Sequence, residues 1–140
     1  MDKSIVPRGI RNNNPLNIRK GSNWRGERHP QSDKAFEEFQ SMTYGIRAGF
    51  KLIKRYMSGY EGKTKPFDTV ELIVKRWAPP SENATQRYID FVASTAGIDP
   101  RQRIDFRNKK VMCDIVSAMI QVECGQKVER EIIESGYDLL

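Results

Sequence analysis

Apolar residues recur at helical spacing through most of the chain after residue 42. Intervals of three and four residues place their side chains on one face of a helix, which predicts a helix with Thr43 as its N-cap. Gly62 and Pro66 are expected to end this first unit. The apolar positions of its face are Ile46, Phe50, Ile53 and Met57.

Two more helices follow from residues that begin and end helices. Asp68 or Thr69 caps a short helix with the sequence VELIVKRW, and the prolines of APP stop it. Asn83 opens the next helix. The face that we expect to pack carries Tyr88, Phe91, Val92 and Thr95.

The last part of the chain continues the helical pattern. Gly97 ends the preceding helix, and the basic stretch RQRIDFRN reads as a loop. Asn108 then caps an apolar helix that closes near Gly125. A weaker helical pattern covers Val128–Glu134. The chain after residue 42 is therefore predicted to be almost wholly helical.

The first 40 residues differ from this pattern. They are polar, with a short apolar alternation at Leu16 and Ile18, and Gly, Asn and Pro interrupt them repeatedly. Such a segment predicts loops and short strands. With no internal repeat or linker, residues 1–140 read as one domain, mainly α (α+β), with a small β lobe at the front.

Glu123 interrupts an otherwise apolar helix face. Successive residues of a helix are rotated by about 100°, so five apolar side chains fall within roughly 80° of Glu123. They are Met112, Ile115, Val116, Met119 and Ile120. Burial raises the pKa of a carboxyl group, and an acid that stays protonated near neutral pH suits general acid catalysis.

Two other interpretations of Glu123 stay open. A glutamate in the last turn of a helix can simply extend into solvent. It can also form a structural ion pair with an arginine, and Arg47, Arg76 and Arg87 are the first candidates.

Charge points to an anionic partner without identifying it. Lys and Arg number 24 and Asp and Glu 18, a net charge of +6, which suits nucleic acid, an anionic membrane or bacterial cell wall, or a merely solvated basic surface. The basic residues are scattered and match no nucleic-acid-binding motif, so nucleic acid is the weaker reading. Cys113 and Cys124 would lie too far apart on one helix to bridge, so we expect free thiols.

No signal region or membrane span is evident. We therefore expect synthesis in the cytoplasm, with delivery by a virion, a lysis system or a secretion system if the target is the cell wall. Other virion or secretion components are then candidate partners. His29 is the single histidine, and no pattern for a metal, a cofactor or a Ser-His-Asp site is present.

The stretch MIQVECG resembles the catalytic helix of lysozyme-superfamily enzymes, in which an apolar helix ends in Glu-Ser-Gly or a close variant. In lytic transglycosylases and bacterial glucosaminidases that glutamate is the general acid. Cys124 stands here in place of the usual serine. The resemblance implies that Glu123 is the catalytic acid.

A second resemblance covers roughly residues 8–95. RGIRNNNPLNIRKGSNWRGE, FEEFQSMTYGIRAGFKLIKRY and RWAPPSENATQRYIDFVA resemble a family of phage and prophage proteins that carry Arg-Asn-Asn-Asn-Pro-x-Asn-Ile. Some members are described as virion structural proteins and others as wall-degrading enzymes. The same blocks resemble parts of glucosaminidases, in which the catalytic helix comes first. The order here implies a circularly permuted lysozyme-like fold with neighbouring termini and a C-terminal catalytic helix.

The resemblance also implies residues that bind a saccharide. Trp77 occupies the place of an aromatic loop residue in the glucosaminidases, although an ordinary core tryptophan explains it equally well. Tyr44 lies in the aromatic-rich block. Asn13 and Asn14 could contact N-acetyl groups or support a turn, and Asn83 could line the cleft or hold its own loop.

A second catalytic carboxylate is harder to assign. Asp33 is the leading candidate, before Glu27, Glu37 and Glu38. A lytic transglycosylase needs one acid/base only, because a hydroxyl of the sugar itself attacks. The sequence thus predicts cleavage of peptidoglycan glycan strands by a lytic transglycosylase, muramidase or glucosaminidase. The alternative is a virion or wall-binding protein without catalysis.

Overall fold

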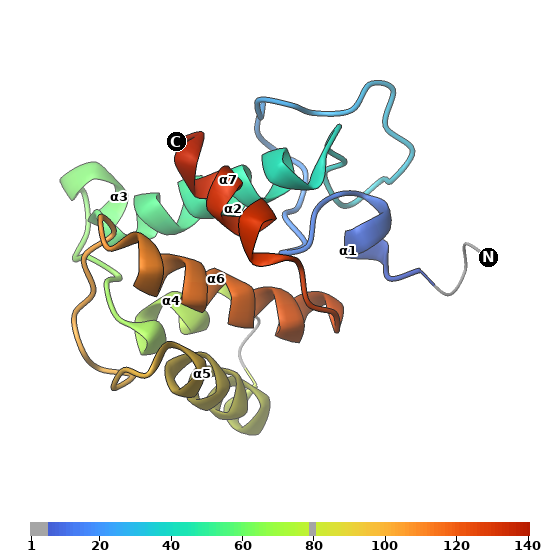
Figure 1. The fold of residues 1–140 in the computed structure, drawn as a ribbon. Helices are drawn as coiled ribbons and strands as arrows, with labels where there is room; N and C mark the ends of the chain where they lie inside the picture. Colours follow the sequence, from blue (N-terminus) through green and yellow to red (C-terminus); the bar gives the residue numbers. More distant parts are fainter. Residues whose placement is uncertain (1–5, 79–80) are drawn as a thin grey trace.

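The structure, a computed structural model, describes residues 6–78 and 81–140, and helices dominate them (Figure 1). We refer to residues 6–41 as the front segment. The helices are α1 (Arg8–Arg11), α2 (Met42–Met57), α3 (Gly59–Gly62), α4 (Val70–Trp77), α5 (Glu82–Ala96), α6 (Lys109–Cys124) and α7 (Arg130–Asp138). The expectation of a mainly helical protein is confirmed.

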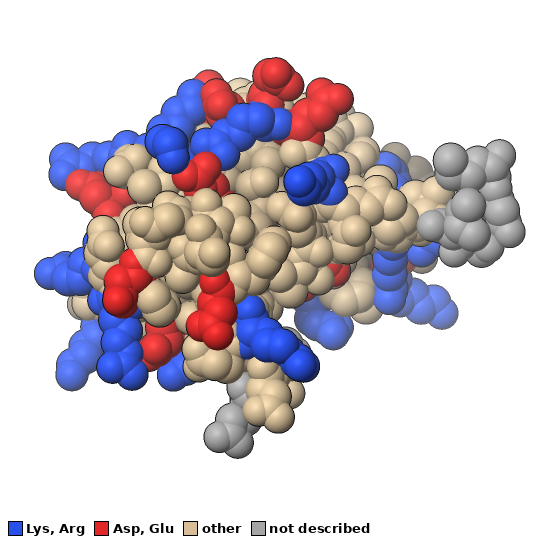
Figure 2. Space-filling view, turned by 60° about the horizontal axis from the view of Figure 1, so that its bottom comes forward, with Lys and Arg blue, Asp and Glu red and all other residues tan. Residues whose placement is uncertain are grey.

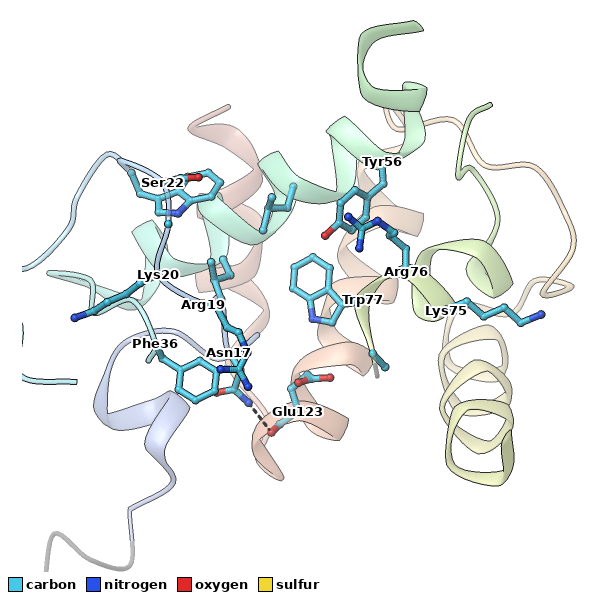
Figure 3. A pocket seen from close by; sticks show the side chains of 15 residues that line it. Asn17, Arg19, Lys20, Ser22, Phe36, Tyr56, Lys75, Arg76, Trp77 and Glu123 are labelled. Atoms are coloured by element: carbon cyan, nitrogen blue, oxygen red, sulfur yellow. Dashed lines mark hydrogen bonds between the residues drawn. The ribbon is translucent and has the colours of Figure 1, made fainter. Parts of the chain in front are cut away.

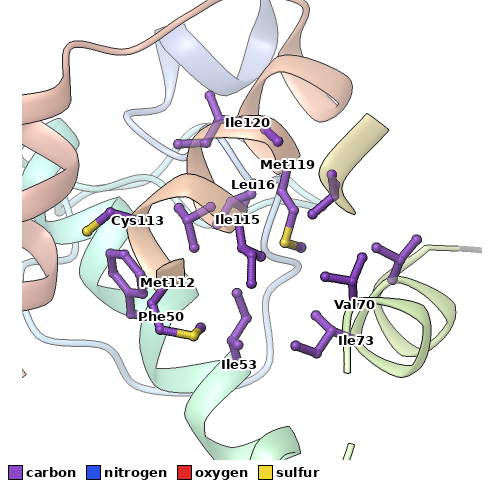
Figure 4. Close-up of a cluster of buried hydrophobic side chains, with 14 of the residues drawn as sticks. Leu16, Phe50, Ile53, Val70, Ile73, Met112, Cys113, Ile115, Met119 and Ile120 are labelled. Carbon is purple, nitrogen blue, oxygen red and sulfur yellow. The ribbon is translucent and has the colours of Figure 1, made fainter. Parts of the chain in front are cut away.

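Helix α6 forms the centre of the molecule. It packs against α5 and α7 and also contacts α1, while α2 pairs with α7 and α4 with α5 (Figure 1). The apolar face predicted for α6 is fully buried, and it meets side chains of α2 and α4 (Figure 4). The labelled members of this core include Phe50, Ile53, Val70, Ile73, Met112, Ile115, Met119 and Ile120.

Most helix ends lie where local signals place them. The Asn108 side chain accepts a hydrogen bond from the amide of Val111, and Gly125 ends α6 in the left-handed conformation that suits glycine. Of the two candidates for α4, Thr69 is the cap. The expected cap of α2, Thr43, is wrong. Ser41, two residues before Thr43, is the N-cap, and its side chain accepts a hydrogen bond from the Tyr44 amide.

Helix α5 corrects a second detail. It begins at Glu82, one residue before the predicted start at Asn83. Tyr88 and Val92 are buried as expected, but Phe91 is 40% exposed. The buried face of this helix therefore runs through Tyr88, Ile89, Val92 and Ala93.

The predicted β lobe is not a sheet. Within the described residues, the front segment forms only two isolated antiparallel bridges, Arg19 with Phe36 and Glu27 with Phe39. A few backbone hydrogen bonds join the paired stretches, and side chains add to them: the Asn14 amide donates to the backbone carbonyls of Ile18 and Glu37. Polar residues that bond to the backbone stabilise irregular loops at the expense of strands, which is why the alternation at Leu16 and Ile18 misled.

Two glycines of α2 let the front segment approach closely. A Cβ atom on Gly45 would lie 1.8 Å from the carbonyl oxygen of Asn13, and one on Gly49 would lie 2.3 Å from a methyl carbon of Leu16. Both distances are far below van der Waals contact, so larger residues would push the front segment away from α2. This contact places the front segment beside the C-terminal end of α6.

The chain ends do not support the simplest form of permutation. In Figure 1 the described chain begins beside α1 and ends after α7, on opposite sides of the view. The expectation of neighbouring termini is therefore wrong for these residues. None of the described helices is long and apolar enough to cross a membrane. On the face in Figure 2, Lys and Arg side chains are interspersed with Asp and Glu.

Candidate active site

A cleft of about 770 Å³ lies between the front segment and the helices (Figure 3). Its walls include Asn17, Arg19, Lys20, Trp24 and Phe36 from the front segment, Leu52 and Tyr56 from α2, Lys75, Arg76 and Trp77 from α4, and Glu123 from α6. Aromatic rings beside a few polar groups are typical of a site for a small organic molecule or a saccharide.

Glu123 reaches this cleft from the last turn of α6. Burial raises the pKa of its carboxyl group, while the nearby Tyr88 hydroxyl and Asn17 amide act in the opposite direction. The ion pairs of the described residues do not include Glu123. The side chain is therefore neither frayed into solvent nor held by an arginine among the described residues, and burial shifts its ionisation towards the neutral acid.

Tyr88 lies behind Glu123 on α5. Its hydroxyl is buried and makes no hydrogen bond of ordinary geometry to any described residue, which is unusual for a buried polar atom. The hydroxyl is nevertheless close enough to Glu123 for each group to shift the pKa of the other. Burial and the neighbouring carboxyl group raise the pKa of Tyr88 far above its ordinary value.

Asn17 joins the front segment to the acid. Its side-chain amide donates to the backbone carbonyl of Glu123 at 3.1 Å, across 106 residues of sequence (Figure 3). Its φ of 55° is left-handed, a conformation that asparagine tolerates better than most residues. Sequence reasoning missed Asn17. Its place just after Asn12–Asn14, on the loop that follows Pro15, was the available signal.

Trp77 lines the cleft and also belongs to the core. Its indole nitrogen donates to the Leu16 carbonyl at 3.3 Å, and its ring contacts Tyr56 with the centroids 5.9 Å apart. It packs at the margin of both hydrophobic clusters. In Figure 3 the ring lies between Tyr56 and Glu123. The two interpretations of Trp77 therefore both describe part of its environment.

Asn13 and Asn14 support the front segment rather than the cleft wall. Asn13 has a φ of 53° and donates to the Phe39 carbonyl at 3.1 Å. Asn14 is fully buried, and its side-chain oxygen accepts from the Ile18 amide. Neither lines the cleft. The structure thus agrees with the second interpretation of Asn13 and Asn14, in which they support a turn.

Three further candidates also lie outside the cleft. Asp33 accepts two hydrogen bonds from Arg8 and others from Asn12 and nearby amides, and the Arg8 guanidinium holds the pKa of this carboxyl group well below its ordinary value. Tyr44 is half-buried and packs beside Ile18 and Phe39. Asn83 is exposed on the first turn of α5. The structure brings only Trp77 and Glu123 of the candidate residues together.

A pair of carboxyl groups lies in the front segment. Glu37 is 4% exposed, and one of its carboxyl oxygens has no hydrogen-bond partner. Burial and the adjacent Glu27 raise the pKa of Glu37 to about 7. The Glu27 carboxylate also accepts from the backbone amide of Trp24 at 2.8 Å, so the pair supports a loop of the cleft.

Comparison with known proteins gives one informative match. Protein P5 of Pseudoalteromonas phage PM2 is 42% identical over 136 residues, which cover 94% of this chain and 80% of that protein. A search against descriptions of protein families finds no match. The similarity to Protein P5 extends over both the front segment and the helices that form the cleft.

Proposed function

The chain belongs to the family of the phage protein P5, and we propose that it cleaves the glycan strands of peptidoglycan with Glu123 as general acid and base. The main support for this proposal is that the Glu123 carboxyl group, whose pKa is raised by burial, lies at the wall of an aromatic-lined cleft. Burial favours the protonated form of a carboxyl group, and that form can protonate the oxygen of a glycosidic bond. The family supports a phage origin for such an enzyme.

The number of carboxyl groups favours a lytic transglycosylase. Among the described residues that line the cleft, Glu123 is the single acidic side chain. Retaining and inverting hydrolases ordinarily use two carboxyl groups at defined separations. Asp33, the leading candidate for a second one, is held by Arg8 outside the cleft.

One acid suffices for the proposed reaction. Glu123 donates its proton to the glycosidic oxygen, and the bond between that oxygen and the anomeric carbon breaks. A hydroxyl of the same sugar then attacks the anomeric carbon and gives its proton to the Glu123 carboxylate. The product is an anhydro sugar, the leaving strand carries a new hydroxyl group, and the acid is restored.

The surroundings of Glu123 suit a glycan. Trp77, Tyr56 and Phe36 line the cleft, and of these the Trp77 ring is the one on which a sugar can pack, because Arg76 lies over the Tyr56 ring and Arg8 and Arg19 lie over the Phe36 ring. A helical part and an irregular front segment, with an acid at the end of a central helix between them, support a lysozyme-like relationship.

A non-catalytic virion or wall-binding protein is the second candidate function. The membership of a phage protein family favours it, because phage proteins include structural components. The cationic residues around the cleft could also hold a wall polymer without cutting it. Activity on purified wall separates the two functions.

The test is mass spectrometry of the fragments released from purified peptidoglycan sacculi. The parent protein should release fragments with anhydro ends, and Glu123→Gln should release none, since general acid catalysis is worth roughly 10²–10⁴-fold in rate. Glu131→Gln, at an exposed position on α7, is the matched control and should behave like the parent.

Other outcomes decide against the proposal. Release by Glu123→Gln at the parental rate would remove the catalytic role of this residue. No release by a folded parent protein would favour the virion or wall-binding function. Reducing ends would instead identify a hydrolase that uses water.

A further inference from the structure

The cleft is bordered by positive charges that the proposed cleavage by Glu123 does not use. Four of its wall residues are cationic, Arg19, Lys20, Lys75 and Arg76, and only Glu123 is acidic among the described wall residues. Arg19 and Lys20 lie on the front segment, and Lys75 and Arg76 lie on α4. Positive charge therefore borders the cleft on two opposite walls.

These charges lie away from the acid. The shift in the pKa of Glu123 comes from burial, Tyr88 and Asn17, and none of the four cations contributes to it. In Figure 3 the side chains of Lys20 and Lys75 extend in opposite directions, away from Glu123. The cations are thus placed to meet substrate groups on either side of the bond that Glu123 cleaves.

The cations remain available to a ligand. Lys20 and Lys75 are exposed. Among the described residues Lys20 has no ion pair, although its charge acts on the nearby Glu37 carboxyl group, and Lys75 has only a long contact of 3.5 Å with Glu71. Arg76 donates through Nε to the Tyr60 hydroxyl at 2.7 Å, which orients the guanidinium, and its other N–H groups make no hydrogen bond to the described residues. Arg19 lies over the Phe36 ring at 4.8 Å.

A neutral glycan would bind no more tightly because of these four cations. Ammonium and guanidinium groups bind carboxylates and phosphates through charge-assisted hydrogen bonds. Peptidoglycan differs from a neutral polymer of N-acetylglucosamine in carrying carboxylates on the peptides attached to its sugars. The peptides are attached to every second sugar, so a strand that runs through the cleft carries such carboxylates at some distance on both sides of a cleaved bond, which matches two cationic walls separated by an acid.

Resting on the proposed function, we propose that Arg19, Lys20, Lys75 and Arg76 make the cleft selective for glycan strands whose attached peptides carry free carboxylates. Strands in which these carboxylates are amides are then poor ligands. The selectivity belongs to binding, because the cations do not touch the acid.

Binding is measured by co-sedimentation with sacculi, in a Glu123→Gln background so that no cutting occurs. Two preparations of the same sacculi are compared, one untreated and one with its carboxylates converted to amides by carbodiimide and ammonia. Untreated sacculi should bind about tenfold more tightly at low salt. An exposed ion pair strengthens binding by up to about fivefold, and salt screens it.

The variants identify the residues responsible. Lys20→Gln with Lys75→Gln should remove most of the difference between the two preparations. Lys63→Gln with Lys127→Gln changes the net charge equally at exposed positions outside the cleft and should preserve the difference. Equal loss with both double variants would show that net charge alone matters and would overturn the proposal.

Two other results also overturn it. Equal binding of amidated and untreated sacculi would exclude carboxylate recognition. Displacement from untreated sacculi by DNA as effectively as by soluble carboxylate-bearing muropeptides would assign the cations to phosphate. The proposed cleavage is judged separately by fragment release from the parent protein, so failure of one is not failure of the other.

Discussion

Tyr88→Phe tests whether the buried hydroxyl acts on Glu123 or merely fills space. The ring packs in the core, but the hydroxyl has no hydrogen bond of ordinary geometry. Phenylalanine keeps the ring and removes only the buried oxygen. A buried polar group without a partner destabilises a protein by about 1–3 kcal/mol, so the variant should be as stable as the parent or more stable by up to that amount.

The same change should alter the pH dependence of cleavage. Tyr88 lowers the pKa of Glu123, so its removal leaves burial less opposed and raises that pKa further. A general acid works while protonated, and the decline of activity at high pH should therefore move to higher pH in Tyr88→Phe. A residue with a purely structural role would not move this part of the profile.

The measurements are thermal unfolding and fragment release from sacculi over a series of pH values. One kcal/mol corresponds to a rise in Tm of about 2–5 °C for a protein of this size. A loss of more than about 1 kcal/mol would show that the hydroxyl is well bonded in the folded protein. An unchanged pH profile would refute the coupling between Tyr88 and Glu123.

Two further predictions concern carboxyl groups of the front segment. The pKa of Glu37 is raised to about 7 in the folded protein, so this group stabilises the fold fully below about pH 4.5, and the contribution is lost as pH rises through about 7. Unfolding should therefore become easier over that range, and Glu37→Gln should reduce the pH dependence of the unfolding free energy by at most about 3 kcal/mol. The same pH dependence in the parent and the variant would contradict this. Asp33→Asn should destabilise by about 1–3 kcal/mol, because the carboxylate accepts hydrogen bonds from Arg8, Asn12 and backbone amides, while fragment release per folded molecule stays parental. Selective loss of release would support Asp33 as a catalytic residue.

Local sequence patterns were sufficient for the central helix and its acid. Each side chain of α6 meets neighbours three and four residues away, so the period of apolar residues predicts the buried face without knowledge of the fold. Asn108 and Gly125 act on backbone groups within one turn, and the helix begins and ends at them as predicted. The position of Glu123 on that face follows from the same geometry.

The front segment depended on contacts that no local pattern contains. Asp33 binds Arg8 across 25 residues, and Asn14 donates to the Glu37 carbonyl across 23. Such bonds form only after the chain has folded back on itself, so the polar residues could be read equally well as sugar ligands or catalytic acids. The sequence alone therefore could not show that Asp33, Asn13 and Asn14 lie outside the cleft.

By itself the sequence determined a mainly helical protein with one acid on an apolar helix face, because helix period and capping are properties of neighbouring residues. Only the tertiary structure decided what surrounds that acid. Asn17 reaches Glu123 across 106 residues, and Tyr88 and Trp77 come from two other helices. A cleft is formed by side chains from distant segments, and their meeting depends on the packing of the whole chain.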